Sequence, residues 1–232
     1  VWDPKNPGQQ MYVGGLVEGQ RIGLDEVWAP KWAGIYIDAA SLAKDANVYN
    51  AFLPYTNKKI KQLGDAQWEQ AFTNDTIDSR QFVKVGRTIP QHTGGFALSG
   101  SYKGLRLYAG FDYAFGFVIL NNEILRGLSQ VQGSQNSTTD VLKTWSPSNP
   151  NGTLPRYYWA NQGRNFATDA SGNNPPANMW EKGDYIMLRE LTLAYDISSD
   201  LLQKYLGGRI KGMSVNITGS NLVYFSRYSG NF

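Results

Sequence analysis

Few residues in this sequence carry side chains that could perform covalent chemistry. It contains no cysteine and a single histidine, His92, so thiol catalysis, disulfides and multi-histidine metal sites are excluded. Asp75 and Asp78 could form an acid/base pair, but an exposed, solvated loop explains them more simply. The nucleophile-elbow, zinc-protease, phosphate-loop and dinucleotide-binding motifs are all missing. We therefore expect no enzyme activity, no cofactor and no metal site.

Aromatic and arginine side chains are better candidates for ligand binding. All seven tryptophans lie outside the segments of alternating polarity described below. Aromatic faces stack on sugars and on peptide side chains, and arginine forks pair with carboxylates. The densest group predicts a substrate-binding patch made of Trp145, Arg156, Tyr157, Tyr158, Trp159 and Arg164. The alternative is that these side chains pack loops onto each other or onto a neighbouring subunit.

Composition narrows the fold class. Among 232 residues, 22 Lys and Arg face 19 Asp and Glu, and this small excess is scattered, whereas nucleic-acid binders concentrate it in a stripe. We therefore expect no nucleic-acid partner. The longest apolar run, residues 117–120, is far shorter than the roughly 20 residues of a membrane-spanning helix. Glycine (25 residues), 13% aromatics and only 18% charged residues favour β-structure with tight turns.

Strict alternation of apolar and polar residues predicts the main strands. From Leu105 to Phe115 every second residue is apolar, and a similar run before Lys103-Gly104 predicts a β-hairpin. Residues 185–196, in their second half, and 212–225 repeat the pattern. A fifth strand is possible at 82–85. The sequence also predicts short helices at 41–47, 55–63, 120–128 and 199–205. Ser41 would cap the first of them, and Gly207-Gly208 would end the last. Residues 68–72 favour a short strand or turn.

These strands have the properties of membrane strands, although a soluble β-sandwich alternates in the same way. Leu107, Ala109, Phe111 and Tyr113 would face lipid, on a side of the 105–116 strand that carries no charge. Aromatics gather near the strand ends, and connections alternate between short and very long, as in outer-membrane barrels. We expect 1–84 to be an extracellular loop region, 85–232 to hold the strands, and 117–184 to form a long extracellular loop.

Several strings, in a fixed order along the chain, resemble the SusC/RagA family of TonB-linked transporters. They are GQRIG at 19–23, GIY at 34–36, the 64–78 segment, TGGFALSGSYKGL at 93–105, GDYIMLRELTLAY at 183–195, GSNL at 219–222 and YSG at 228–230. One departure is the 73–78 segment, which lacks the glycines of the family's calcium-like loop, so no calcium site is predicted.

The resemblance implies an all-β fold, with this chain forming a C-terminal part of a transmembrane barrel of about 22 strands. The plug domain would lie outside this chain, and four or five strands alone leave open edges that lipid does not tolerate. The implied function is TonB-driven import of glycan or peptide fragments across a Gram-negative outer membrane. The implied partners are a SusD-like surface lipoprotein, TonB through the missing N-terminal part, membrane lipid and an oligosaccharide or peptide. The alternative function is a soluble β-sandwich that binds carbohydrate.

Overall fold

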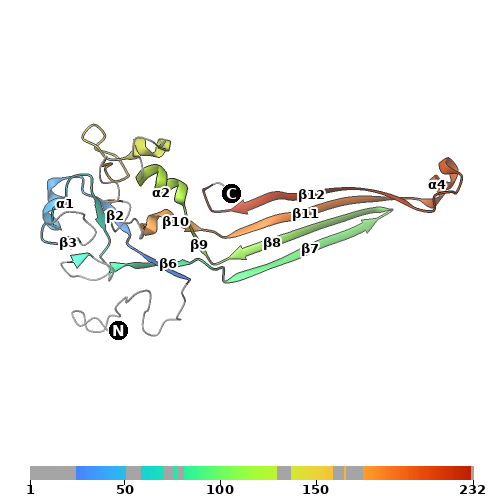
Figure 1. The fold of residues 1–232 in the computed structure, drawn as a ribbon, viewed down its shortest axis with the longest axis horizontal. Helices are drawn as coiled ribbons and strands as arrows, with labels where there is room; N and C mark the ends of the chain where they lie inside the picture. The colour runs from blue at the N-terminus through green and yellow to red at the C-terminus, as the bar shows by residue number, and fades with distance from the viewer. Residues whose placement is uncertain are drawn as a thin grey trace. The chain divides into compact units, whose positions relative to one another are not determined.

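The computed structural model describes residues 25–50, 59–70, 76–77, 81–129, 137–158, 165 and 175–230. The chain divides into two compact units (Figure 1). The loop unit comprises residues 1–88, 118–181 and 229–232, and the sheet unit comprises residues 89–117 and 182–228.

The sheet unit is built on one antiparallel sheet of four long strands. They are β7 (His92–Tyr102), β8 (Leu105–Phe115), β11 (Tyr185–Ile197) and β12 (Met213–Ser226). Their order is β12-β11-β8-β7, so the two strands that are consecutive in space at the centre, β8 and β11, are far apart in sequence. The hairpin and both later strands predicted from alternation are therefore confirmed.

Both short connections of the sheet lie at the same end. Lys103 and Gly104 adopt φ values of 47° and 85°, the left-handed pair of a tight hairpin turn that matches strand twist. A Cβ on Gly104 would lie 2.8 Å from the carbonyl oxygen of Asp196, which explains why glycine is needed. At the same end, β11 and β12 are joined through α4 (Ser199–Leu206), which ends at Gly207 with φ of 62°, as predicted.

The loop unit consists of short elements. Its two-stranded sheets pair β1 (Glu26–Ala29) with β6 (Val83–Arg87), β2 (Trp32–Ile35) with β4 (Ala66–Trp68), β3 (Tyr49–Asn50) with β5 (Thr76–Ile77), and β9 (Val118–Leu120) with β10 (Trp180–Lys182). Its helices are α1 (Ala39–Lys44), α2 (Asn122–Ser129) and the 3₁₀ turns η2 (Thr139–Lys143) and η3 (Ala177–Met179).

Two small apolar clusters hold these elements together. One contains Val48, Ala66, Trp68 and Ile77, and the other contains Leu125, Leu128 and Met179. Trp32 packs against both, so a single large side chain on β2 joins segments that are more than a hundred residues apart in sequence. Such burial compensates for the short length of the strands, which would not be stable alone.

Several local expectations differ from the structure. α1 begins earlier than expected because Asp38, rather than Ser41, is the N-cap: its carboxylate accepts from the Ser41 amide at 2.7 Å. No helix forms at 59–63, while 55–58 lie outside the described residues. Of the short strand or turn expected at 68–72, only Trp68 lies in a strand, as the last residue of β4, and residues 71–72 lie outside the described residues. α2 is capped by Asn121, whose side chain accepts from the Ile124 amide.

In the described part of the chain, no helix is long and apolar enough to cross a bilayer.

Candidate functional site

The long sheet has one face without charged side chains apart from those of its turns. Pairing register places the alternating apolar residues of all four strands on this side, from Phe96 and Leu98 on β7 to Val215 and Ile217 on β12. We call it the apolar face. It comprises Gly94, Phe96, Leu98, Gly100, Tyr102, Leu105, Leu107, Ala109, Phe111, Tyr113, Phe115, Ile186, Leu188, Leu191, Leu193, Tyr195, Ile197, Met213, Val215, Ile217, Gly219, Val223 and Phe225, with His92 at its edge.

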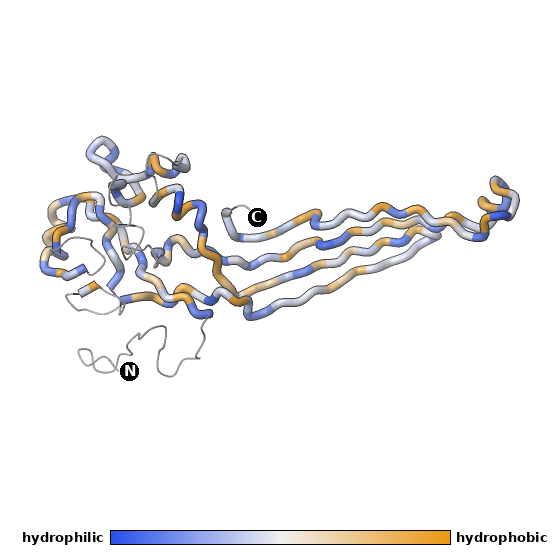
Figure 2. The backbone as a smooth tube through the Cα atoms, viewed as in Figure 1, coloured by the Kyte–Doolittle hydropathy of each residue, from blue (hydrophilic) through white to orange (hydrophobic). Residues whose placement is uncertain are grey.

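The side chains of the apolar face are open to their surroundings. Ile217 is 74% exposed and Leu98 is 62% exposed, values far above those of a protein core. The sheet unit is described in full, and it contains no second sheet that could cover this face. Figure 2 shows the alternation of hydrophobic and hydrophilic residues along the strands. A contiguous apolar surface of this kind needs an apolar environment.

The opposite face of the sheet is polar, and it carries paired charges. Arg106 on β8 contacts Asp196 on β11 at 2.8 Å, and Arg189 contacts Asp112 at 2.7 Å. The hydroxyls of Thr192 and Thr218 lie 2.8 Å apart across β11 and β12. This face, which we call the polar face, can therefore line a wet interior, where its ion pairs and hydroxyls stay hydrated.

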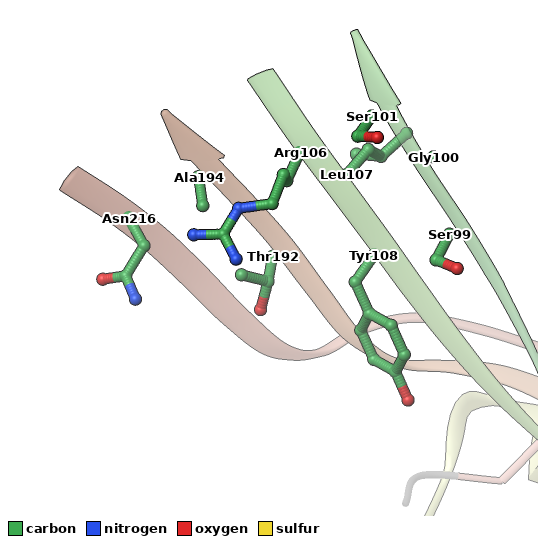
Figure 3. Close-up of a pocket in the computed structure, with 9 residues that line it drawn as sticks. All are labelled: Ser99, Gly100, Ser101, Arg106, Leu107, Tyr108, Thr192, Ala194 and Asn216. Carbon is green, nitrogen blue, oxygen red and sulfur yellow. The ribbon is translucent and has the colours of Figure 1, made fainter. Parts of the chain in front are cut away.

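A shallow hollow of about 530 Å³ lies on the polar face near the short-turn end (Figure 3). Ser99, Ser101, Arg106, Tyr108, Thr192 and Asn216 contribute side chains to it. The lining mixes hydroxyls, one amide and one guanidinium, which suits contact with water or a polar solute. These residues come from all four strands, so the hollow exists only when the sheet is assembled.

Irregular pairing in the sheet keeps the two faces separate. Leu188 pairs with Phe111 whereas Glu190 pairs with Gly110, so Arg189 is an extra residue in β11. On β12, the partners of Leu188 and Glu190 are Val223 and Ser220, which leaves Asn221 and Leu222 between them. Without the bulge, Leu188 and Leu191 would face opposite sides, because side chains alternate along a strand.

Strand length fits the thickness of a membrane. β8 has eleven residues, which at about 3.3 Å each and a tilt near 45° span about 26 Å along the membrane normal. That is close to the apolar band of about 25 Å in outer-membrane barrels. The strand predicted at 105–116 is therefore long enough to cross.

Aromatic residues lie near both ends of the strands, but they do not all face the same way. Tyr113 and Phe115 stack at 5.4 Å on the apolar face. Tyr185 and Tyr224 stack at 5.1 Å on the polar face, because Tyr185 pairs with Ala114. Of the aromatics from which the sequence predicts a girdle, Tyr102, Tyr113, Phe115, Tyr195 and Phe225 lie on the apolar face, whereas Tyr185 and Tyr224 lie on the polar face.

In the loop unit, three of the predicted binding residues form one stack. The Arg156 guanidinium carbon lies 6.0 Å from the Trp145 ring centre and 5.2 Å from the Tyr158 ring centre. Trp145 is only 6% exposed, whereas Arg156, Tyr157 and Tyr158 are half-buried. An arginine close to two aromatic rings combines cation–π attraction with apolar contact. Trp159 and Arg164, the other two candidates, lie outside the described residues.

Residues around Gly64 hold this stack in place. The Tyr158 hydroxyl donates to the Asp65 carboxylate at 2.8 Å, and Asp65 is 2% exposed. The Arg156 amide donates to the Gly64 carbonyl at 2.6 Å. Gly64 has φ of 88°, and a Cβ there would run into the Trp145 ring and lie 2.6 Å from the Arg156 Cβ. Nothing in the sequence marks Gly64 or Asp65 as parts of the patch, because neither residue type signals such a role alone.

Two further buried groups extend the network. Asn165 accepts from the Ala66 amide at 2.9 Å and donates to the Arg156 carbonyl at 3.1 Å. The Tyr36 hydroxyl donates to Asp45 at 2.8 Å, and burial together with this neighbouring carboxylate raises the pKa of Tyr36 well above its ordinary value. Within the described residues no group of three or more His, Cys, Asp or Glu side chains is placed to hold a metal ion.

Comparison with known proteins gave curated relatives and solved structures, but no family model matches the chain. It is 27% identical over 157 residues to TonB-dependent receptor P3 of Formosa agariphila, covering 68% of this chain and 14% of the relative. It is 25% identical over 188 residues to TonB-dependent receptor P39 of the same organism, covering 77% of this chain and 16% of the relative. The chain thus spans about one seventh of the length of these relatives.

Solved structures share the fold. The RagAB peptide transporter matches over 88% of this chain and 20% of the solved chain, with a TM-score of 0.57 and 21% identity. The RagAB peptide importer in its open-open state matches over 92% of this chain and 22% of that chain, with a TM-score of 0.59 and 19% identity. The chain is thus similar in sequence to TonB-dependent receptors, and it shares its fold with part of the RagAB transporter structures.

Proposed function

We propose that this chain forms part of the wall of an outer-membrane nutrient importer that works with TonB. The observation that carries the proposal is the sheet with one uncharged, exposed face and one polar face with paired charges. The apolar face would contact lipid, and the polar face would line the interior of the barrel. Similarity to two TonB-dependent receptors supports energised import as the activity of the whole protein.

The proposed orientation of the strands is based on their connections. In bacterial outer-membrane barrels short turns lie in the periplasm and long segments lie outside the cell. On this basis the Lys103-Gly104 turn and α4 lie on the periplasmic side. The extracellular part would comprise 117–184 and the region 1–84, and the domain division predicted from sequence, with strands within 85–232, is kept as a proposal.

The imported substrate would be a glycan or peptide fragment, and a SusD-like lipoprotein would close the barrel from outside. Solved relatives of the fold are described as peptide transporters, which supports a peptide. Trp145, Arg156, Tyr157, Tyr158, Trp159 and Arg164 stay our candidates for the region that contacts substrate. The stack of Arg156 on Trp145 and Tyr158 supports a role in shaping that region rather than in chemistry.

The test of the lipid-facing role compares arginine on the two faces at one depth. Leu98 and Ser99 are adjacent on β7, both exposed, and they point to opposite faces. In the full-length transporter, Leu98→Arg should cost about 2–4 kcal/mol of folding free energy in bilayers, because lipid cannot solvate the charge. Ser99→Arg should cost much less. Folding into lipid vesicles, titrated with urea and followed by gel mobility, measures both.

Equal destabilisation by the two variants would overturn the assignment of faces. The alternative, a soluble carbohydrate-binding β-sandwich, differs in its behaviour without detergent. A sandwich would bury the apolar face under a second sheet and would fold in water, whereas a barrel wall would need lipid or detergent. The sheet unit shows no such layer. We therefore retain the transporter wall as the proposed function.

A further inference from the structure

The connection between β11 and β12 has an apolar side that the sheet does not cover. On α4, Leu201, Leu202, Tyr205 and Leu206 fall within a sector of about 140°, as expected for an amphipathic helix. Leu202 is buried, but Tyr205 is 72% exposed and Leu201 and Leu206 are exposed as well. Exposed Ile210 follows the helix. If this connection lay at a membrane surface, the acyl chains of the lipid would cover these apolar side chains.

The same connection is basic. Residues 198–212 contain Lys204, Arg209 and Lys211 against one carboxylate, Asp200. Lys103 adds a fourth cation from the hairpin turn at this end of the sheet, where the Asp196 amide donates to the Gly104 carbonyl. Since Asp196 is paired with Arg106, it does not offset these charges. The local balance therefore favours an anionic partner.

Lysines lie close to tyrosine rings at this end of the sheet, as they do at a membrane boundary. Lys204 Nζ lies 5.5 Å from the Tyr205 ring centre, and Lys103 Nζ lies 5.2 Å from the Tyr102 ring centre. Tyrosine places its ring at the headgroup level, while lysine extends its ammonium group toward phosphate. The apolar face continues to this level, because Ile197 and Met213, which pair with each other, close its short-turn end.

We propose that residues 198–212 bind the phosphate headgroups of anionic phospholipid. α4 would lie in the headgroup layer, with Leu201, Tyr205 and Leu206 toward the acyl chains and Lys204, Arg209 and Lys211 toward phosphate. The partner is a phospholipid leaflet, because a leaflet presents negative phosphate next to an apolar layer and so matches both the cations and the apolar side chains of this connection. This inference rests on the proposed function, since it requires the apolar face to contact lipid.

Site-directed spin labelling of the full-length transporter tests the inference. This chain has no cysteine, so Tyr205→Cys and Ile217→Cys each give one label in it once any cysteine elsewhere is replaced. The protein is reconstituted in phosphatidylcholine vesicles and in equimolar phosphatidylcholine and phosphatidylglycerol vesicles. Accessibility to oxygen and to a neutral nickel chelate reports depth. The variant Lys204→Gln/Arg209→Gln/Lys211→Gln is the matched control.

The label at 217 should favour oxygen in both vesicles. At 205, exclusion of the nickel chelate should increase when phosphatidylglycerol is present, and the glutamine variant should lose this increase. Titration of the phosphatidylglycerol fraction should show about a five-fold weaker lipid preference for each cation removed.

Other outcomes separate the two proposals. A water-accessible label at 217 would remove the proposed function itself. A lipid-facing label at 217 with a water-accessible label at 205 in both vesicles would overturn only the headgroup site. The same holds if residue 205 is shielded from both reagents, which would mean contact with protein, or if neither phosphatidylglycerol nor the glutamine variant changes its depth.

Discussion

At the scale of single residues, Arg156 is a proposed substrate contact that also packs the loop unit. Its guanidinium group lies over Trp145 and Tyr158, and its amide bonds the Gly64 carbonyl. Tyr158 in turn donates to the buried Asp65 carboxylate. Such a network fixes the 62–66 segment against 145–158, so the proposed ligand contact would be coupled to loop packing at these residues.

The hydroxyl of Tyr158 should therefore contribute to local stability. Tyr158→Phe removes a donor from a buried carboxylate and should destabilise the loop unit by about 1–3 kcal/mol. Hydrogen exchange of the 62–66 and 145–158 amides in the full-length protein measures this as faster exchange.

A double-mutant cycle with Asp65→Asn gives the control. If the hydroxyl acts through Asp65, the two substitutions should be strongly non-additive. Additive effects, or unchanged exchange in Tyr158→Phe, would show that the 2.8 Å contact does not stabilise the loop.

At the scale of elements, the bulge across β11 and β12 decides which side chains lie on the apolar face. Asn221 has φ of 54°, a left-handed conformation that asparagine and glycine tolerate and β-branched residues do not. Arg189, the extra residue of β11, contacts Asp112 and approaches Asn221 at 3.4 Å, so the bulge carries a polar cluster.

Substitution at Asn221 should separate backbone from side-chain effects. Asn221→Gly keeps the left-handed backbone accessible and should change the free energy of unfolding little. Asn221→Val should cost about 1–2 kcal/mol more, because a β-branched residue is strained there. Urea unfolding of the full-length protein in bilayers compares the two. Equal stability of both variants would mean that the positive φ does not constrain this position.

Another element-scale contact ties the segment after β12 to β10 and α2. Glu181 accepts from the Ser229 hydroxyl and amide at 2.7 Å each and from Asn121 at 2.8 Å. Burial alone would raise the pKa of Glu181, but the hydrogen bonds from Ser229 and Asn121 outweigh it and hold the pKa below its ordinary value of 4.5.

A lowered pKa gives this contact a defined pH dependence. Its stabilising effect is complete above the ordinary value of 4.5 and is lost as the pH falls through the lower pKa of the folded protein. Exchange of the Ser229 amide, corrected for intrinsic rates, should therefore accelerate below pH 4.5. In Glu181→Gln the exchange should be fast and independent of pH over that window. A pH-dependent Glu181→Gln profile identical to the native one would assign the effect to another group.

At the scale of the whole molecule, the proposed orientation places one end of the sheet toward the cell exterior. The two short connections share one end, and the long segment between β8 and β11 leaves from the other. Leu142, 77% exposed in η2, reports on the long segment, and the exposed Gln203 in α4 reports on the short connections.

Cysteine labelling in cells tests this topology. In full-length protein, Leu142→Cys should react with a polyethylene-glycol maleimide on intact cells, whereas Gln203→Cys should react only after the outer membrane is permeabilised. Labelling of solubilised membranes gives the total reactive cysteine for both. Reaction of Gln203→Cys alone on intact cells would reverse the proposed orientation.

The sequence by itself determined the four long strands of the sheet unit, because period-two alternation follows directly from the geometry of a pleated strand. It predicted the β7–β8 hairpin and the second half of β11, where Leu191, Leu193 and Tyr195 alternate. It missed the alternation of the first half because the extra residue Arg189 shifts the pattern, and only pairing with β8 reveals the shift.

Only the tertiary structure decided what depends on distant segments. The sequence grouped Trp145, Arg156 and Tyr158 by residue type, but their packing required Gly64 and Asp65, which lie about 80 to 94 residues earlier in the chain. Likewise, Ser41 was a plausible cap until the structure placed Asp38 there. Local patterns encode the periodicity of a strand, whereas contacts between loops depend on chain geometry that no local pattern records.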